Sequence, residues 1–227
     1  MYADEDAAGT PDLLAVARPL LSASDRGGLQ ELLGREGNTD RLTAMLTNGD
    51  RAAARLAAQC LAFAGGPETA RHLVELLHQD DRVVWTLAEN ALWGIWFHAG
   101  DDRANAELHA AVEALGDERT AEAIRRLDDL IARCPRFAEA HNQRAIAHYL
   151  KDDFCRAIGD CRTTLELNPI HFAAHAGMGH CYTALSRFQD ALHCYHHALQ
   201  VHPHLEGIRQ SIGQIRMLLA RRCGPPM

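Results

Sequence analysis

The sequence has no long hydrophobic run and only one lysine, Lys151. A helix that crosses a membrane needs about 20 consecutive apolar residues, and the apolar stretches Leu61–Gly66 and Ala91–Phe97 are much shorter. Residues 1–6 (MYADED) are acidic, whereas a secretory signal starts with basic residues and continues with an apolar segment. These absences predict a cytoplasmic protein without a membrane partner.

The cysteine pattern of a disulfide-stabilised protein is also missing. The chain has seven cysteines, which is an odd number, and no Cys-x-x-Cys pair. Its 227 residues are enough to bury a core without covalent cross-links. We therefore expect reduced thiols at positions 60, 134, 155, 161, 181, 194 and 223.

The sequence has no excess of basic residues either. Thirty Asp and Glu residues against 23 Lys and Arg residues give a formal charge of −7, and the pI is about 6.0. Sequence-independent binding of nucleic acid requires a basic surface that neutralises phosphates, so we expect no nucleic-acid partner. The hydrophobic fraction of 47% is that of an ordinary globular protein.

Motifs of catalytic and cofactor sites are absent as well. The sequence contains no phosphate-binding glycine loop, no Gly-x-Ser-x-Gly elbow, no His-Glu-x-x-His helix and no calcium loop. It therefore indicates no catalytic residue and no cofactor. This pattern favours a protein that is not an enzyme.

What the sequence does contain is a helical period throughout. Leu and Ala recur about every 3.6 residues, and the two-residue alternation of strands is hard to find. We expect an all-α fold. The helices are predicted at residues 39–47, 50–64, 67–78, 82–98, 119–133, 138–151, 154–167, 172–185, 188–201 and 205–221.

The second half repeats every 34 residues. Two sets of residues carry this period, namely Pro135, Pro169 and Pro203, and Ala123, Ala157 and Ala191. The last unit reads His175-x2-Met178-Gly179-x2-Tyr182, followed by Ala191-x3-Tyr195. It resembles the tetratricopeptide repeat, with His175 where Trp is usual. The resemblance implies a solenoid of antiparallel helix pairs, with three units in residues 101–204, the first of them degenerate.

A final helix is predicted after the last repeat. It has an apolar stripe that steps by three and four residues, made of Leu205, Ile208, Ile212, Ile215 and Leu219. A stacked array needs such a helix because no further repeat covers its last apolar surface. We therefore expect a capping helix at residues 205–222.

The first half repeats every 31 residues. Leu42 and Leu61 recur as Leu73 and Leu92, and Asp50 and Asp81 stand where helix N-caps belong. This half is similar to short HEAT repeats, which also occur in bilin-lyase-like proteins. We expect a disordered tail at residues 1–10, HEAT-like helices at residues 11–100 that include one or two irregular helices before residue 36, and a boundary near Gly100.

Arg144 occupies a slot in which many tetratricopeptide units carry Leu. A charge buried there needs a partner. A subtype of the family is similar, with an Asn-Arg-Gly-like triplet and an Asp in the second helix, matched here by Gln143-Arg144-Ala145 and Asp160. The resemblance implies a structural ion pair between Arg144 and Asp160.

The resemblance also implies a binding face, because tetratricopeptide units turn their first helices towards a concave side. The candidate contact residues for a protein or peptide partner are Asn142, Ile146, Tyr149, His171, Ala176, His180 and Thr183. The family's carboxylate clamp uses Lys, Arg and Asn, whereas Ile146 and Ala176 occupy clamp-type slots here. The expected ligand is therefore an extended or helical peptide, with Tyr149 and Ile146 as anchors.

Two further groups of residues stand out. Trp93 and Trp96, with Trp85, suggest either a second interface or packing at the junction of the two arrays, and the second interpretation is favoured. Among the 14 His, His193 and His197 lie one helical turn apart, but a structural zinc site needs four converging ligands. No metal site is predicted.

The sequence is best explained by a non-enzymatic interaction scaffold. One alternative is a regulatory or accessory subunit of an enzyme, like the HEAT proteins related to bilin lyases. Another is a protein that binds metal through His and Cys. The oligomeric state cannot be derived from these residues.

Overall fold

The computed structural model describes residues 12–48 and 50–223. The chain forms two compact units, and the boundary between them along the sequence lies between Ile95 and Trp96. Within these ranges the regular elements are α-helices and there is no strand, so the expected all-α fold class is confirmed. None of the described helices is both long enough and apolar enough to span a membrane. The tail expected at residues 1–10 lies outside the described ranges.

The first unit is built from six helices within the described residues. They are α1 (Leu13–Ser22), α2 (Arg26–Gly34), α3 (Asn38–Asn48), α4 (Arg51–Ala64), α5 (Pro67–Leu76) and α6 (Arg82–Phe97), the last two residues of which belong to the second unit. Helices α1 and α2 are the irregular pair that the sequence predicted before residue 36.

The helix starts of the first unit follow from local sequence. The Asp50 carboxylate accepts hydrogen bonds from the backbone N–H groups of Ala52 and Ala53, both at 2.8 Å, and Asp81 accepts one from Val83 at 2.7 Å. Pro67 is the first residue of α5, where its missing N–H has no helical partner to lose. The predicted N-caps at Asp50 and Asp81 are confirmed.

The 31-residue period of the first unit corresponds to its core. Leu42 and Leu73 are fully buried at equivalent positions, as are Leu61 and Leu92. Each period thus contributes a pair of helices whose Leu and Ala side chains face inward.

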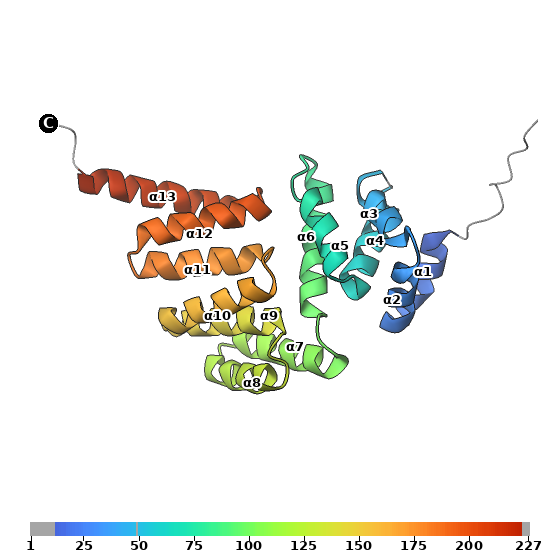
Figure 1. Cartoon of the computed structure of the whole chain (residues 1–227), viewed down its shortest axis with the longest axis horizontal. Helices are drawn as coiled ribbons and strands as arrows, with labels where there is room; N and C mark the ends of the chain where they lie inside the picture. Colours follow the sequence, from blue (N-terminus) through green and yellow to red (C-terminus); the bar gives the residue numbers. More distant parts are fainter. Residues whose placement is uncertain (1–11, 49, 224–227) are drawn as a thin grey trace, which may run out of the picture. The chain divides into compact units, whose positions relative to one another are not determined.

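The second unit is a stack of helix pairs. Its helices are α7 (Asp102–Gly116), α8 (Thr120–Arg133), α9 (Ala138–Leu150), α10 (Phe154–Leu167), α11 (Phe172–Ala184), α12 (Phe188–Val201) and α13 (Glu206–Cys223). Figure 1 shows this stack running from the α7–α8 pair to α13, with each helix packed against its neighbour in sequence. No helix was predicted between residues 98 and 119, at the start of the unit described as degenerate, but the structure has α7 there.

The helix pairs of the second unit share one turn. Glu118, Asp152 and Ser186 follow the first helix of each pair, lie 34 residues apart and adopt positive φ angles of 57–60°. In the middle pair the N–H of Asp153 donates to the carbonyl of His148, and that of Asp152 donates to the carbonyl of Tyr149. These bonds form a Schellman motif, which ends a helix at a left-handed residue.

Small residues allow the helices of a pair to approach closely. A Cβ on Gly179 in α11 would lie 2.5 Å from the ring of Tyr195 in α12, so no larger residue fits there. Ala157 and Ala191 are fully buried in the second helices of their pairs. Small residues at these positions therefore set the spacing of the paired helices.

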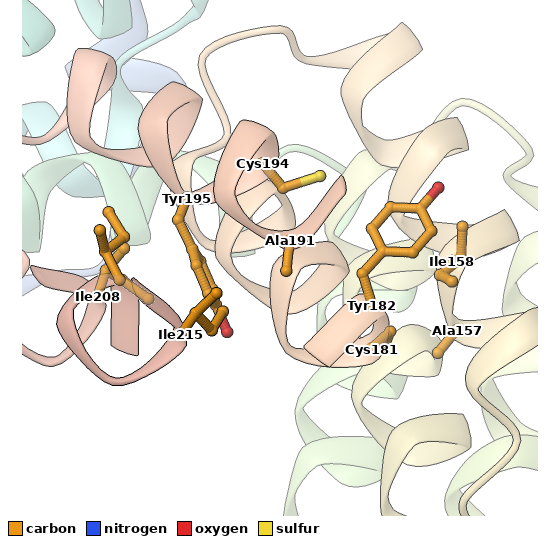
Figure 2. Close-up of a cluster of buried hydrophobic side chains, with 10 residues drawn as sticks. Ala157, Ile158, Cys181, Tyr182, Ala191, Cys194, Tyr195, Ile208 and Ile215 are labelled. Atoms are coloured by element: carbon orange, nitrogen blue, oxygen red, sulfur yellow. The ribbon is translucent and has the colours of Figure 1, made fainter. Parts of the chain in front are cut away.

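The last helix covers the end of the stack. Ile208, Ile212 and Ile215 of α13 are buried in the cluster that contains Tyr195. Figure 2 shows Ile208 and Ile215 beside the Tyr195 ring, and Tyr182 beside Ile158 at the other end of the cluster. The predicted capping helix is therefore present, and its apolar stripe faces α12.

Candidate functional site

The candidate face on α9 has an exposed half. Ile146, Tyr149 and Leu150 are 41%, 39% and 55% exposed, although all three are large apolar side chains. They lie at positions i, i+3 and i+4, which share one side of a helix. The Tyr149 ring packs edge-on against Phe154 of α10, with a centroid distance of 5.6 Å, and this contact holds its orientation.

In the other half of the candidate face, a buried carboxylate binds the candidate side chains and keeps them from solvent. Glu139 is 1% exposed, and its Oε1 accepts hydrogen bonds from the side-chain amides of Asn142 at 3.0 Å and Gln143 at 2.7 Å. Its Oε2 lies 2.8 Å from Nε2 of His171. The Nδ1 atom of His171 accepts the backbone N–H of Ala174, which leaves Nε2 as the nitrogen that donates to Glu139.

This network corrects two expectations. Asn142 and His171 were expected on the exposed face, but the structure buries both, with 3% and 0% exposure. The physical reason is Glu139, because a carboxylate removed from water requires several hydrogen-bond donors. Glu139 was missed from the sequence. The signal was the amide side chains of Asn142 and Gln143, which follow it at i+3 and i+4.

Three candidate residues lie on α11, where they are half-buried. Ala176 packs against the buried cluster, so the expectation of an exposed Ala176 is also corrected. Nδ1 of His180 is 2.8 Å from the Tyr195 hydroxyl, and Thr183 donates to the Gly179 carbonyl at 2.9 Å. Burial lowers the pKa of His180, so its ring is neutral at neutral pH. Among the described residues, the Nε2 atom of His180 has no hydrogen-bond partner.

The ion pair expected between Arg144 and Asp160 is present. Nε and one terminal nitrogen of Arg144 donate to the two oxygens of Asp160 at 2.9 and 2.7 Å, and a third donor reaches Asp128 at 2.8 Å. Burial acts to raise the pKa of Asp160, but the His141 ring and the Arg144 guanidinium outweigh it and hold this pKa below its usual value. Arg144 is thus committed to two carboxylates and is not available for a ligand.

The tryptophan pair does not form an exposed surface. Trp96 is buried, and its ring stacks on His171 with a centroid distance of 4.2 Å. Trp93 is half-buried within the first unit. Trp96 packs inside the second unit and therefore cannot contribute to the expected second interface.

The structure describes no ready-made metal centre, since no group of three or more His, Cys, Asp or Glu side chains is arranged around a common point in the ranges it covers. The thiols of Cys60, Cys161, Cys181 and Cys194 are free and buried. Burial raises the pKa of Cys60, Cys181 and Cys194 to about 11, and it raises that of Cys161 further. These four thiols are protonated at neutral pH and are poor nucleophiles.

The family model of the tetratricopeptide repeat matches residues 172–205, which cover α11, α12 and the following turn. Residues 172–205 are thus similar to one tetratricopeptide repeat. The α7–α8 and α9–α10 pairs have the same helix order and the same 34-residue spacing, which extends the tetratricopeptide resemblance over the second unit.

Two curated relatives also contain this repeat. A TPR repeat-containing protein of Rhizobium etli is 26% identical over 129 residues, which are 57% of this chain and 62% of the relative. The tetratricopeptide repeat-containing protein trd-1 of Caenorhabditis elegans is 28% identical over 106 residues, which are 47% of this chain and 12% of the relative. This chain therefore matches less than two thirds of the length of each relative.

Solved structures agree on the tetratricopeptide fold. The first TPR domain of Spaghetti (RPAP3), bound to the HSP90 peptide SRMEEVD, has a TM-score of 0.52 and 21% identity, and the match covers 53% of this chain and 96% of that one. The TPR domain of Sgt2 from Aspergillus fumigatus has a TM-score of 0.51 and 14% identity, and the match covers 56% of this chain and 87% of that one. At these identities the likeness shows the fold alone.

Proposed function

We propose that this chain is a non-enzymatic protein-interaction module that binds a peptide segment of a partner on its tetratricopeptide unit. The contact surface consists of Ile146, Tyr149 and Leu150 on α9 with His180 and Thr183 on α11, and it is called the α9–α11 face below. We place the protein in the cytoplasm and regard the first unit as HEAT-like. Its 31-residue period and the buried Leu pairs of that period support the last assignment.

The observation that carries this proposal is the exposure of three large apolar side chains on one side of α9. Other positions of the same helix, such as Asn142 and Ala145, are buried. Exposed apolar surface bordered by polar groups is typical of interaction sites. The 34-residue register places His180 at the position equivalent to Ile146, so the face continues from α9 onto α11.

The chemistry of the face favours an apolar, uncharged segment. Capture of a peptide carboxylate requires several convergent cationic donors. Arg144 is occupied by Asp160 and Asp128, and the only lysine of the chain, Lys151, stands at the end of α9. The face offers instead apolar contact from Ile146 and Leu150, with hydrogen bonds from the Tyr149 hydroxyl and the His180 ring.

A peptide selection tests this proposal directly. Random 12-residue peptides displayed on phage are selected against the full chain, and the enriched sequences are measured by isothermal titration beside SRMEEVD. We expect enrichment of apolar sequences and no binding of SRMEEVD. An acidic C-terminal consensus among the selected peptides would contradict the assigned chemistry.

Matched variants then locate the site. Tyr149→Ala should weaken binding of a selected peptide by about 1 to 3 kcal/mol, because aromatic anchors dominate such interfaces. His196→Ala, a change at an exposed position on α12, should leave affinity unchanged. If Tyr149→Ala and Ile146→Ser both bind as tightly as the parent, the α9–α11 face is not the binding surface.

A further inference from the structure

A pair of imidazole rings on α12 is independent of the α9–α11 face. His193 and His197 lie one helical turn apart, and their Nε2 atoms are 3.1 Å from each other. The ring planes are nearly perpendicular, at 82°, with centroids 4.5 Å apart. His193 is exposed and His197 is half-buried.

The geometry of this pair suits chelation. In this contact the Nε2–H of one ring donates to the Nε2 lone pair of the other. When the donor ring adopts the tautomer that carries its proton on Nδ1, both Nε2 atoms offer a lone pair. A metal ion bonded to both nitrogens at about 2.0 to 2.1 Å would subtend an angle of about 95 to 100°, between the octahedral and tetrahedral values. The Nε2–Nε2 distance therefore allows a single metal ion to bond to both nitrogens.

A third histidine packs against one of the two chelating rings, that of His197. The ring of His175 on α11 stacks on that of His197 with a centroid distance of 5.3 Å and an interplanar angle of 23°. The Nδ1 atom of His175 is buried without a hydrogen-bond partner among the described residues. The packing fixes the orientation of His197 before any ion binds, which lowers the entropic cost of chelation.

We propose that His193 and His197 form an open binding site for a divalent transition-metal ion that prefers imidazole, namely Cu²⁺, Ni²⁺ or Zn²⁺. Water fills the remaining coordination positions, because the described residues place no third ligand at this point. Imidazole nitrogen suits these ions, whereas Mg²⁺ and Ca²⁺ require oxygen ligands. Affinity should follow the general order of such sites, with Cu²⁺ the tightest.

The test uses the full chain without a polyhistidine tag, which would itself bind the ions. Isothermal titration with CuCl₂, NiCl₂ and ZnCl₂ should show one ion bound per chain, with Cu²⁺ tightest and with no response to MgCl₂. His193→Ala and His197→Ala should each weaken Ni²⁺ binding by about tenfold or more, because each removes half of the chelate. Circular dichroism in EDTA checks that the variants keep their fold.

His196→Ala is the matched control, because His196 is exposed on the same helix between the two ligands and contacts Arg216. It should bind Ni²⁺ as the parent does. The proposal is overturned if the parent binds none of the three ions. Equal loss in His196→Ala and His197→Ala, or parental affinity in both His193→Ala and His197→Ala, would overturn it as well.

Discussion

At the residue scale, the pair of Arg144 and Asp160 shows how a single slot in a repeat determines a buried interaction. The side chain of Asp160 is 8% exposed and that of Arg144 is 21% exposed, and two hydrogen bonds join them. We predict that Asp160→Ala lowers the free energy of unfolding by about 3 kcal/mol, because it strands a buried guanidinium. The loss stays at the low end of the usual range since Arg144 keeps Asp128. Urea unfolding measures it.

Two controls separate the charge pair from simple packing. Replacing both partners by apolar residues, as in Arg144→Met with Asp160→Leu, should cost much less than Asp160→Ala. Acid titration supplies the second control. The pKa of Asp160 is depressed in the folded state, so its stabilisation is present above about pH 4, its unfolded value, and is lost as pH falls through the folded pKa. If Asp160→Asn shows the same acid dependence as the parent, this carboxylate makes no contribution.

At the element scale, each of the turns that end α7, α9 and α11 contains a non-glycine residue with a positive φ angle, which lowers stability. Ser186 has φ of 57°, where an L-residue other than Gly is disfavoured by about 1 to 2 kcal/mol. Glycine removes this penalty, but it lowers the free energy of unfolding by about 0.4 to 1 kcal/mol because the unfolded chain gains conformational freedom. We therefore predict that Ser186→Gly raises stability by about 0.5 kcal/mol, measured as a higher urea midpoint. Ser186→Val should lower it, and a lower midpoint for Ser186→Gly would contradict the argument.

The same scale shows what sequence could predict and what it could not. Helix ends depend on neighbouring residues, such as Asp50 before α4 and Pro67 in α5, and the predicted bounds agree with the structure to within about two residues. Burial depends on residues distant in sequence. His171 meets Glu139 across 32 residues, and this contact, which no local pattern shows, removes His171 from the exposed face.

At the scale of the whole molecule, the 34-residue register decides which surfaces remain open. Packing within and between the helix pairs uses Ala157, Gly179 and Ala191, but leaves Ile146 and Tyr149 without cover. A repeat array always has such surfaces, because each unit contacts only its neighbours. The function we propose uses one of them, and the metal site occupies another.

The register also explains why the array needs α13. Without this helix the last apolar surface, which includes Tyr195, would meet water. Ile208, Ile212 and Ile215 cover it, and a fully buried side chain of this size stabilises by about 1.5 to 3 kcal/mol. We predict that a chain ending at His204 unfolds at a much lower urea concentration and self-associates through the uncovered surface.

Point variants on the two sides of α13 make this prediction quantitative. Ile212→Ala, on the covered side, should cost about 2 to 5 kcal/mol by leaving a cavity beside the buried cluster. Leu218→Ala, on the opposite side, is the control, because Leu218 is 46% exposed and should change stability by less than about 0.5 kcal/mol. Urea unfolding compares both with the parent. If both changes lower stability equally, α13 stabilises the array through its helix content alone. If only Ile212→Ala lowers stability, α13 stabilises the array through the apolar stripe that covers α12.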